Sequence, residues 1–136
     1  MQVENKTPVQ QLSGSVLVVD DNEINRFLSS KVLTKWGINV DLAEDGKVAL
    51  DKIQQTTYDL ILMDLHMPVM DGMEASREIR KLGGIYTRLP IIALTASLFS
   101  HELETIAECG MDGYVMKPFV PNELYQKIKN YFKVVS

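Results

Sequence analysis

Only one cysteine, Cys109, occurs among the 136 residues, so no disulfide can form within the chain. Proteins of reducing compartments generally lack disulfides, and we therefore expect a cytoplasmic location. The sequence also has no apolar run long enough to span a membrane, and its polar first residues do not form a signal peptide. These absences favour a soluble domain, either free-standing or carried as the cytoplasmic part of a membrane-anchored protein.

Positive charge is sparse as well. The formal net charge is −4, and the lysines and arginines form no run. We therefore expect no nucleic-acid partner for this chain, and no contact of this domain with a membrane. With 46% hydrophobic and 24% charged residues, the composition is that of one globular domain with a sizeable core.

Residues 1–14 differ in character from the rest of the chain. They are polar and rich in glutamine, and they contain Pro8 and Gly14. Such a composition is typical of a linker or a disordered leader. We therefore place the folded domain at residues 15–136.

Short apolar runs alternate with segments of helical periodicity throughout residues 15–136. The run Val16–Val19 is continuous and mostly β-branched, which is typical of a strand buried on both faces. The same pattern predicts strands over 16–19, 40–43, 60–63, 91–94 and 114–116, and helices over about 24–36, 46–55, 73–82, 98–109 and 122–132. Five strands alternating with five helices predict an α/β fold, a doubly wound parallel sheet with right-handed crossovers.

Polar residues follow these predicted strands at their carboxyl ends. Asp20 and Asp21 follow the first strand, Asp64 the third, Thr95 the fourth and Lys117 the fifth. In a parallel sheet these ends lie along one edge, where open α/β sheets bind their ligands. Each residue alone has an ordinary explanation as a helix cap or a solvated turn. Their recurrence strand after strand favours a shared site.

The chemistry of this set points to a phosphoryl group and a metal ion. Three carboxylates packed together repel one another, and a hard divalent cation, Mg²⁺ or Mn²⁺, relieves that repulsion. Magnesium in proteins usually completes its coordination with water and a phosphate oxygen. Asp64 can attack phosphorus and form an aspartyl phosphate, while Lys117 and Thr95 bind phosphoryl oxygens.

The chain resembles the receiver domains of two-component response regulators from about residue 15 to residue 132. The resemblance rests on four motifs in the family's order: VLVVDDNEINR at 16–26, LILMDLHMPVMDG at 60–72, IIALTA at 91–96 and GYVMKPF at 113–119. It implies a flavodoxin-like (βα)5 fold with strand order 2-1-3-4-5. The stretch DDNEINR is most similar to the receivers of hybrid histidine kinases.

The resemblance also implies roles for the clustered residues. Asp64 corresponds to the phosphorylated aspartate, Asp21 to a direct magnesium ligand and Asp20 to a neighbour that acts largely through water. The backbone carbonyl of His66 is implied as a further metal ligand, and only the backbone of His66 is expected to matter for binding. The alternative is that its side chain, which titrates near neutral pH, affects dephosphorylation. Lys117 corresponds to the family's lysine, and its bond to the following proline is often cis in this family.

Two further residues correspond to the family's switch. Thr95 resembles the hydroxyl that turns toward the phosphoryl group, and Tyr114 resembles the aromatic ring that follows it. Their movement is expected to reshape the face formed by the fourth helix, fifth strand and fifth helix. The implied partner is a histidine kinase or a histidine-phosphotransfer protein that carries a phosphohistidine. A receiver catalyses its own phosphorylation and dephosphorylation, and so differs from an enzyme that acts on an external substrate.

Three other functions are compatible with parts of the pattern. A phosphatase of the haloacid dehalogenase type also uses an aspartate after a strand, but it requires an acid two residues later, where this chain has His66. A flavin-phosphate module requires a Gly/Ser/Thr-rich loop after the first strand, where this chain has Asp20-Asp21-Asn22-Glu23. An inactive receiver that serves only as an interaction module would not require the full residue set.

Overall fold

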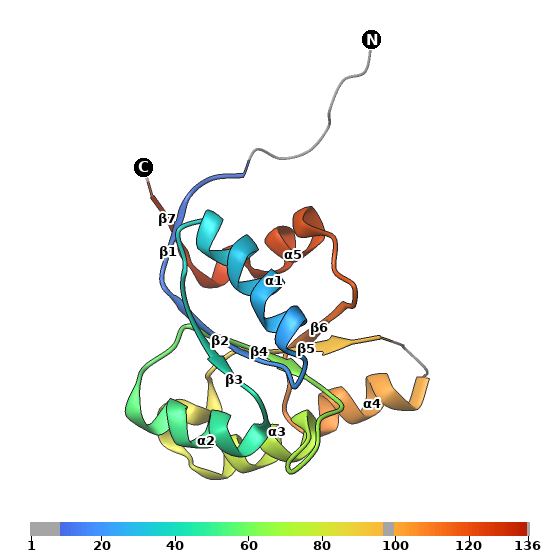
Figure 1. The fold of residues 1–136 in the computed structure, drawn as a ribbon. Coiled ribbons are helices and arrows are strands. Elements are labelled where there is room, and N and C mark those ends of the chain that lie inside the picture. The colour runs from blue at the N-terminus through green and yellow to red at the C-terminus, as the bar shows by residue number, and fades with distance from the viewer. Residues whose placement is uncertain (1–8, 97–99, 136) are drawn as a thin grey trace.

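The computed structural model describes residues 9–96 and 100–135, which form a three-layer α/β/α arrangement (Figure 1). The central sheet has five parallel strands in the order β3-β2-β4-β5-β6. The strands are β2 (Ser15–Val19), β3 (Asn39–Ala43), β4 (Leu60–Asp64), β5 (Ile91–Thr95) and β6 (Gly113–Met116). The helices are α1 (Glu23–Lys35), α2 (Gly46–Gln55), α3 (Gly72–Lys81), α4 (Ser100–Glu108) and α5 (Pro121–Ile128), with 3₁₀ turns η1 (Gly84–Thr87) and η2 (Lys129–Tyr131).

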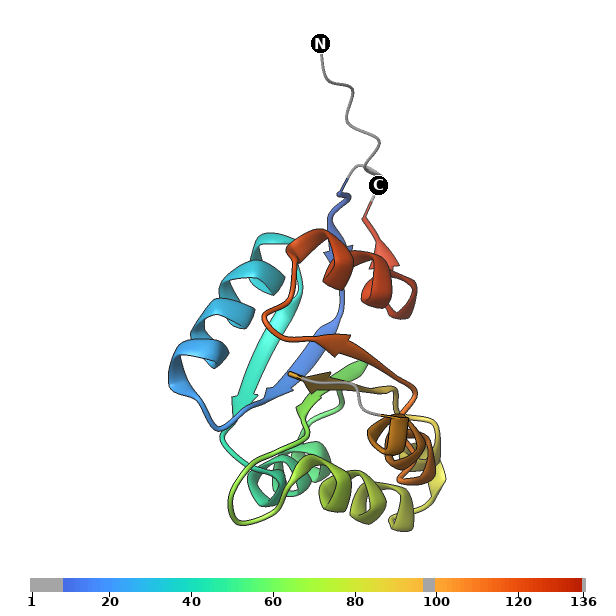
Figure 2. The same cartoon turned by 90° about the vertical axis from the view of Figure 1, so that its right-hand side faces the viewer.

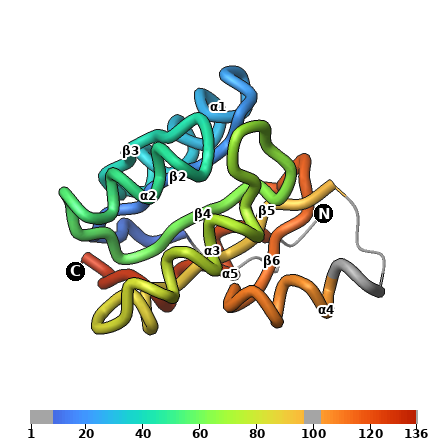
Figure 3. Tube along the Cα trace, turned by 90° about the horizontal axis from the view of Figure 1, so that it is seen from below, coloured from blue at the N-terminus to red at the C-terminus, as the bar shows by residue number. Residues whose placement is uncertain are grey.

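The helices cover both faces of the sheet, and the strand sequences explain why. Successive residues of a strand point to opposite faces. Leu17 and Val19 pack in the cluster that includes residues of α2, α3 and α4, whereas Val16 and Val18 pack in the cluster on the side of α1 and α5. Figures 2 and 3 show these two helical layers from other directions. A continuous apolar strand is required because neither face meets water.

The fold predicted from the sequence is confirmed. Counting only the sheet strands, the observed order is the predicted 2-1-3-4-5. The predicted ends of most elements agree within a residue or two. The last helix is shorter than predicted because α5 ends at Ile128 and continues as the 3₁₀ turn η2. The predicted start of the fourth helix at Leu98 lies outside the described residues.

Side-chain caps fix where three of the helices begin. Asn22, Asp45 and Asp71 each accept a hydrogen bond at 2.8–2.9 Å from the backbone N–H three residues further on. Asparagine and aspartate are favoured at this position because they satisfy an N–H group that has no partner inside the helix. Asp71 is therefore the N-cap of α3.

A second, two-stranded sheet joins the two ends of the chain. Strand β1 (Leu12–Ser13) pairs antiparallel with β7 (Lys133–Val134). The sequence pattern does not predict this pair, and β1 lies within the stretch assigned above to the leader. Residues 1–8 of that leader lie outside the described residues.

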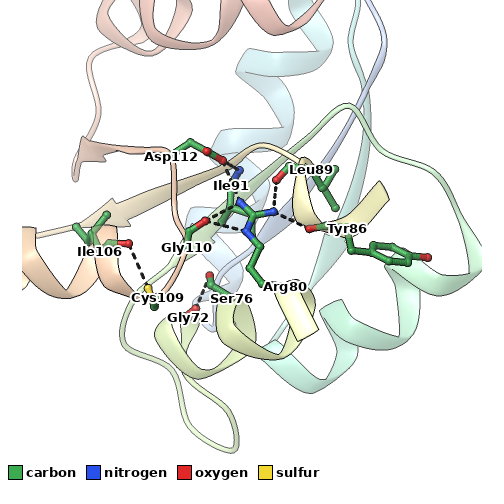
Figure 4. Close-up of polar contacts among 10 residues, drawn as sticks. All are labelled: Gly72, Ser76, Arg80, Tyr86, Leu89, Ile91, Ile106, Cys109, Gly110 and Asp112. Atoms are coloured by element: carbon green, nitrogen blue, oxygen red, sulfur yellow. Dashed lines mark hydrogen bonds and ion pairs between the residues drawn. The ribbon is translucent and has the colours of Figure 1, made fainter. Parts of the chain in front are cut away.

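The connections at the opposite edge of the sheet from the acidic residues are held by Arg80 of α3 (Figure 4). Its guanidinium donates hydrogen bonds of 2.6–2.9 Å to the backbone carbonyl oxygens of Tyr86, Leu89 and Gly110. It also pairs at 3.1 Å with Asp112, whose carboxylate accepts the N–H of Ile91 at 2.9 Å. One side chain thereby fixes the segments that enter β5 and β6.

None of the helices in the described part of the chain combines the length and apolar character needed to cross a membrane.

The hydroxyl of Tyr58 is hydrogen-bonded to the edge strand β3, and removing it tests how much this contact stabilises the fold. It donates a 2.6 Å hydrogen bond to the Asp41 carboxylate of β3, and burial together with Asp41 raises the pKa of Tyr58 to about 12. We expect Tyr58→Phe to lower the free energy of unfolding at pH 7 by about 1–2 kcal/mol, because Asp41 loses its partner.

The pH dependence of the same pair follows from linkage. The unfolded phenol ionises near pH 10.0 and the folded phenol near pH 12, so the unfolded state binds fewer protons between these values. Stability should therefore fall more steeply in wild type than in Tyr58→Phe as pH rises from about 10 to 12. Urea denaturation across this range measures the difference. Parallel pH profiles of the two proteins would contradict the assignment.

Candidate functional site

The polar residues singled out in the sequence lie together at the carboxyl edge of the sheet. Asp20 follows β2, Asp64 ends β4, Thr95 ends β5 and Lys117 follows β6. Carboxylate oxygens of Asp20, Asp21 and Asp64 lie within 4.8 Å of one another. Side chains from four separate segments of sequence therefore meet because the strands are parallel.

Lys117 bridges two of these carboxylates. Its Nζ lies 3.1 Å from Asp64 Oδ2 and 3.4 Å from Asp20 Oδ2. Asp20 is 1% exposed and Asp64 is 5% exposed, whereas Asp21 is exposed to solvent. Three carboxylates with one ammonium leave a surplus of negative charge, and two of them have little access to water.

The shifted pKa values reflect this crowding. Burial raises the pKa of the Asp64 carboxyl, and the nearby charge of Asp20 adds to the effect, although Lys117 and the N–H of His66 act in the opposite direction. Burial acts to lower the pKa of Lys117, but the carboxylates of Asp64 and Asp20 more than offset it and raise that pKa above its ordinary value. Both shifts indicate that the site favours additional positive charge.

The donor set suits a hard divalent cation. The three clustered side chains offer only carboxylate oxygens, the ligands that Mg²⁺ prefers, and they lie close enough to share one ion. Softer metals select thiolate or imidazole ligands, and Cys109 is buried elsewhere in the core. The residues present therefore fit the magnesium or manganese ion expected from the sequence.

The predicted switch residues flank the cluster. Thr95 is 1% exposed, and its carbonyl oxygen accepts a hydrogen bond from the backbone N–H of Lys117 at 2.8 Å. Tyr114 of β6 is half-buried, packs against the core, and has the ammonium of Lys127 5.3 Å from the centre of its ring. Thr95 and Tyr114 thus lie on adjacent, hydrogen-bonded strands.

His66 lies in the loop that follows Asp64, and Pro118 lies in the loop after β6, next to Lys117. The backbone N–H of His66 donates to Asp64 Oδ1 at 3.3 Å, and the residue is exposed. The peptide bond between Lys117 and Pro118 is cis, in agreement with the family resemblance.

Two residues of the site were not singled out from the sequence. Arg26 of α1 donates a 2.7 Å hydrogen bond from Nη1 to the carbonyl oxygen of Asp20, which ties the acidic turn to α1. Gly72 begins α3 against the backbone of Asp64, where a Cβ atom would clash with the Asp64 carbonyl oxygen. Gly72 directly follows the N-cap Asp71, so the sequence places it at the start of a helix. Nothing in the sequence pattern indicates the contact of Arg26 with Asp20.

The loop between β4 and α3 is held against the site by backbone contacts. The N–H of Gly72 donates to the carbonyl of Leu65, and the N–H of Gly46 donates to that of Met70, both at 3.0 Å. At the exposed tip, Val69 has φ of 72°, an uncommon conformation for a β-branched residue. Such strain is found preferentially where a loop serves a site.

Known proteins share this fold. The sequence is 41% identical over 128 residues to hybrid signal transduction histidine kinase I of Dictyostelium discoideum, with 88% of the chain covered. The chain superposes with a TM-score of 0.80 on the receiver domain of a sensor histidine kinase of Pseudomonas aeruginosa, which has a magnesium ion coordinated in its active-site cleft. That protein is 37% identical, and the match covers 88% of this chain and 97% of that one.

A second solved structure is the chemotaxis protein CheY4 of Vibrio cholerae. It is 33% identical with a TM-score of 0.83, covering 88% of this chain and 98% of that one. The matched kinases are much longer than this chain, which spans 7% of the Dictyostelium kinase and 14% of a histidine kinase of Oryza sativa subsp. japonica.

The fold and the acidic edge thus define a CheY-like α/β domain of two-component signalling. The sequence profile of the response regulator receiver domain matches residues 16–129, and the chain belongs to this family.

The close approach at Gly72 yields a stability prediction. We expect Gly72→Ala to lower the free energy of unfolding by about 1–3 kcal/mol, because the added methyl group overpacks the backbone of Asp64 and lies 2.9 Å from Met63 Cγ. Gly113→Ala is the matched control, because its methyl group would lie at an ordinary 3.5 Å from Ile92. Urea denaturation of the two variants measures the difference. Equal stability losses would contradict the packing described here.

Proposed function

We propose that this domain accepts a phosphoryl group from a phosphohistidine onto the carboxylate of Asp64. One observation carries the proposal. The Asp64 carboxylate is buried at a strand end, with Lys117 Nζ at 3.1 Å and two further carboxylates clustered beside it. A buried carboxylate beside a fixed ammonium, within a cation-binding cluster, is suited to attack phosphorus while negative charge accumulates.

In the transfer step, an Asp64 carboxylate oxygen forms a bond to phosphorus as the bond from phosphorus to the donor imidazole nitrogen breaks. The donor ring, protonated on its other nitrogen, leaves as neutral imidazole, and Asp64 becomes an acyl phosphate. Lys117 then exchanges its contact with the Asp64 carboxylate for a phosphoryl oxygen, a charge-assisted contact over a similar distance. Later attack by water, or by a downstream histidine, removes the phosphoryl group.

Asp20, Asp21, Asp64 and the backbone carbonyl of His66 would hold the Mg²⁺ or Mn²⁺ ion. When bound, the ion neutralises charge on the transferring phosphoryl oxygens and orients them. Asp20 already accepts the N–H of Asn22 at 2.9 Å and contacts Lys117, which supports an indirect role through water. Asp21 is exposed and is therefore the more accessible direct ligand.

The switch is proposed to pass from Thr95 to Tyr114. A phosphoryl group on Asp64 attracts the Thr95 hydroxyl, and the half-buried Tyr114 ring moves into the space that this leaves. The contact of Lys127 with that ring connects β6 to α5. The face formed by α4, β6 and α5 then changes its shape and charge for a partner.

The partner class is proposed from the relatives. Hybrid signal transduction histidine kinases of Dictyostelium discoideum carry regions 39–41% identical to most of this chain. A histidine kinase or a histidine-phosphotransfer protein is therefore the proposed phosphodonor, and the proposed setting is the cytoplasm, free-standing or within a longer kinase.

Phosphorylation can be tested with the small-molecule donor acetyl phosphate. We expect the chain, incubated with acetyl phosphate and Mg²⁺, to gain one phosphoryl group by intact mass spectrometry, and Asp64→Asn to gain none. Asp71→Asn is the matched control, since it makes the same chemical change nearby and asparagine caps a helix as well as aspartate does. No mass gain in wild type, or a gain that persists in Asp64→Asn, would contradict the proposal.

Metal binding is predicted to stabilise the fold independently of phosphorylation. At a Mg²⁺ concentration about 100 times the dissociation constant, the free energy of unfolding should rise by about 2.7 kcal/mol. Asp21→Asn should lose most of this gain, whereas Asp45→Asn, which only caps α2, should keep it. Thermal unfolding with Mg²⁺ and with a chelator measures the gain. If Mg²⁺ stabilises Asp21→Asn as much as wild type, Asp21 is not a ligand of the metal ion.

A further inference from the structure

The two ends of the domain meet beside α5, as Figures 1 and 2 show. Besides the pairing of β1 with β7, the N–H of Val135 donates to the carbonyl of Gln11 at 2.8 Å. We call residues 10–14 together with 133–135 the terminal clasp. It lies outside residues 16–129, which the family profile matches.

The clasp is hydrogen-bonded to α5 and to the end of α1. The hydroxyl of Tyr125 in α5 accepts the N–H of Gln10 at 2.9 Å and donates to its carbonyl oxygen at 3.1 Å. The N–H of Leu12 donates to the carbonyl of Trp36 at 2.7 Å, and the Gln11 side chain donates to the carbonyl of Lys35 at 3.0 Å.

One residue of the clasp, Leu12, is buried in the core, whereas the residues of β7 are exposed. Leu12 is 2% exposed and belongs to the same cluster as Trp36 and Tyr125, whose rings meet edge to face at 5.1 Å. Gly37 allows the approach, because its φ is +93° and a Cβ atom there would lie 2.6 Å from the Leu12 carbonyl oxygen. The contact of Leu12 thus depends on a glycine at position 37, which is unlike a chance contact of an unstructured leader.

The other end of α5 is held differently. A groove of about 640 Å³ separates α1 from the loop that leads into α5, with Leu28 and Val32 on one side and Phe119 and Pro121 on the other. Lys117, which contacts Asp64, lies on the same groove. The start of α5 therefore borders an open groove, whereas its middle and far end are bonded to the clasp and continue into η2.

We propose that the terminal clasp is the fixed end of α5, so that events at the phosphorylation site swing α5 about the clasp. Whatever chain precedes residue 9 is then attached to the pivot and not to the moving end. This inference rests on the proposed function, because phosphorylation of Asp64 supplies the movement.

Amide hydrogen exchange at single-residue resolution tests the pivot on the full chain. With acetyl phosphate and Mg²⁺, the amides of Leu12 and Val135 should keep their protection within about twofold, while those of Phe119 and Val120 change by about tenfold. Loss of protection at Leu12 and Val135 in phosphorylated wild type would overturn the pivot. Intact mass, measured on the same sample, reports phosphorylation. Absence of the adduct means instead that the proposed function has failed, and the pivot with it.

Two variants test whether the clasp bonds matter, without requiring phosphorylation. Tyr125→Phe removes the hydroxyl and keeps the ring, and Gly37→Ala wedges the clasp open. Each should speed exchange at Leu12 by about tenfold. Tyr131→Phe is the control for the first, since Tyr131 is an exposed residue of η2. Gly83→Ala is the control for the second, since Gly83 has φ of +74° with nothing within 4 Å of a Cβ atom. Exchange at Leu12 that is no faster in the two variants than in their controls would overturn the inference.

Discussion

Carboxylates of Asp20, Asp21 and Asp64 are held within 4.8 Å of one another by the ends of two neighbouring parallel strands, and a single ammonium offsets them. Two of the three are almost wholly buried. In water such groups would separate, but the paired backbone of β2 and β4 keeps them together. The surplus charge makes the site receptive first to a cation and then to a phosphoryl group that the cation and Lys117 can bind together.

The remainder of the structure serves this arrangement in different ways. Apolar strands covered on both faces give the sheet its rigidity. The cap at Asn22 starts α1 directly after the Asp20-Asp21 turn, and the cap at Asp71 starts α3 at the end of the turn that follows Asp64. The contacts of Arg26 with Asp20 and of Gly72 with Asp64 fix those turns from outside. At the opposite edge, Arg80 secures the segments that lead into β5 and β6 without touching the site.

The fold and the membership of the site could be predicted from the sequence because both depend on local patterns. A continuous run such as Val16–Val19 specifies a strand buried on two faces, and the polar residue that follows it must then lie at the carboxyl edge. The strand order that the family resemblance implies is confirmed, as is the receiver family itself. The individual roles of Asp64, Thr95 and Lys117 stay predictions until they are measured.

The features that escaped prediction depend on contacts that no sequence pattern indicates. Pairing of Leu12 with Val134 spans almost the whole chain, and a two-residue strand in a polar segment has no periodicity to detect. Arg26 is one cation among many until its carbonyl partner is known. His66 is similar: its backbone contact to Asp64 is visible, but spacing alone assigns its side chain no task.

The central claim concerns one atom, the Asp64 carboxylate oxygen that forms the acyl phosphate. Phosphoryl transfer from a phosphorylated histidine-phosphotransfer domain, followed by borohydride reduction of the acyl phosphate and peptide mass spectrometry, locates that atom directly. The account predicts that the reduced residue is Asp64 and that no other aspartate is modified. Reduction at another residue, or a chain left unmodified while the donor retains its phosphoryl group, would contradict it.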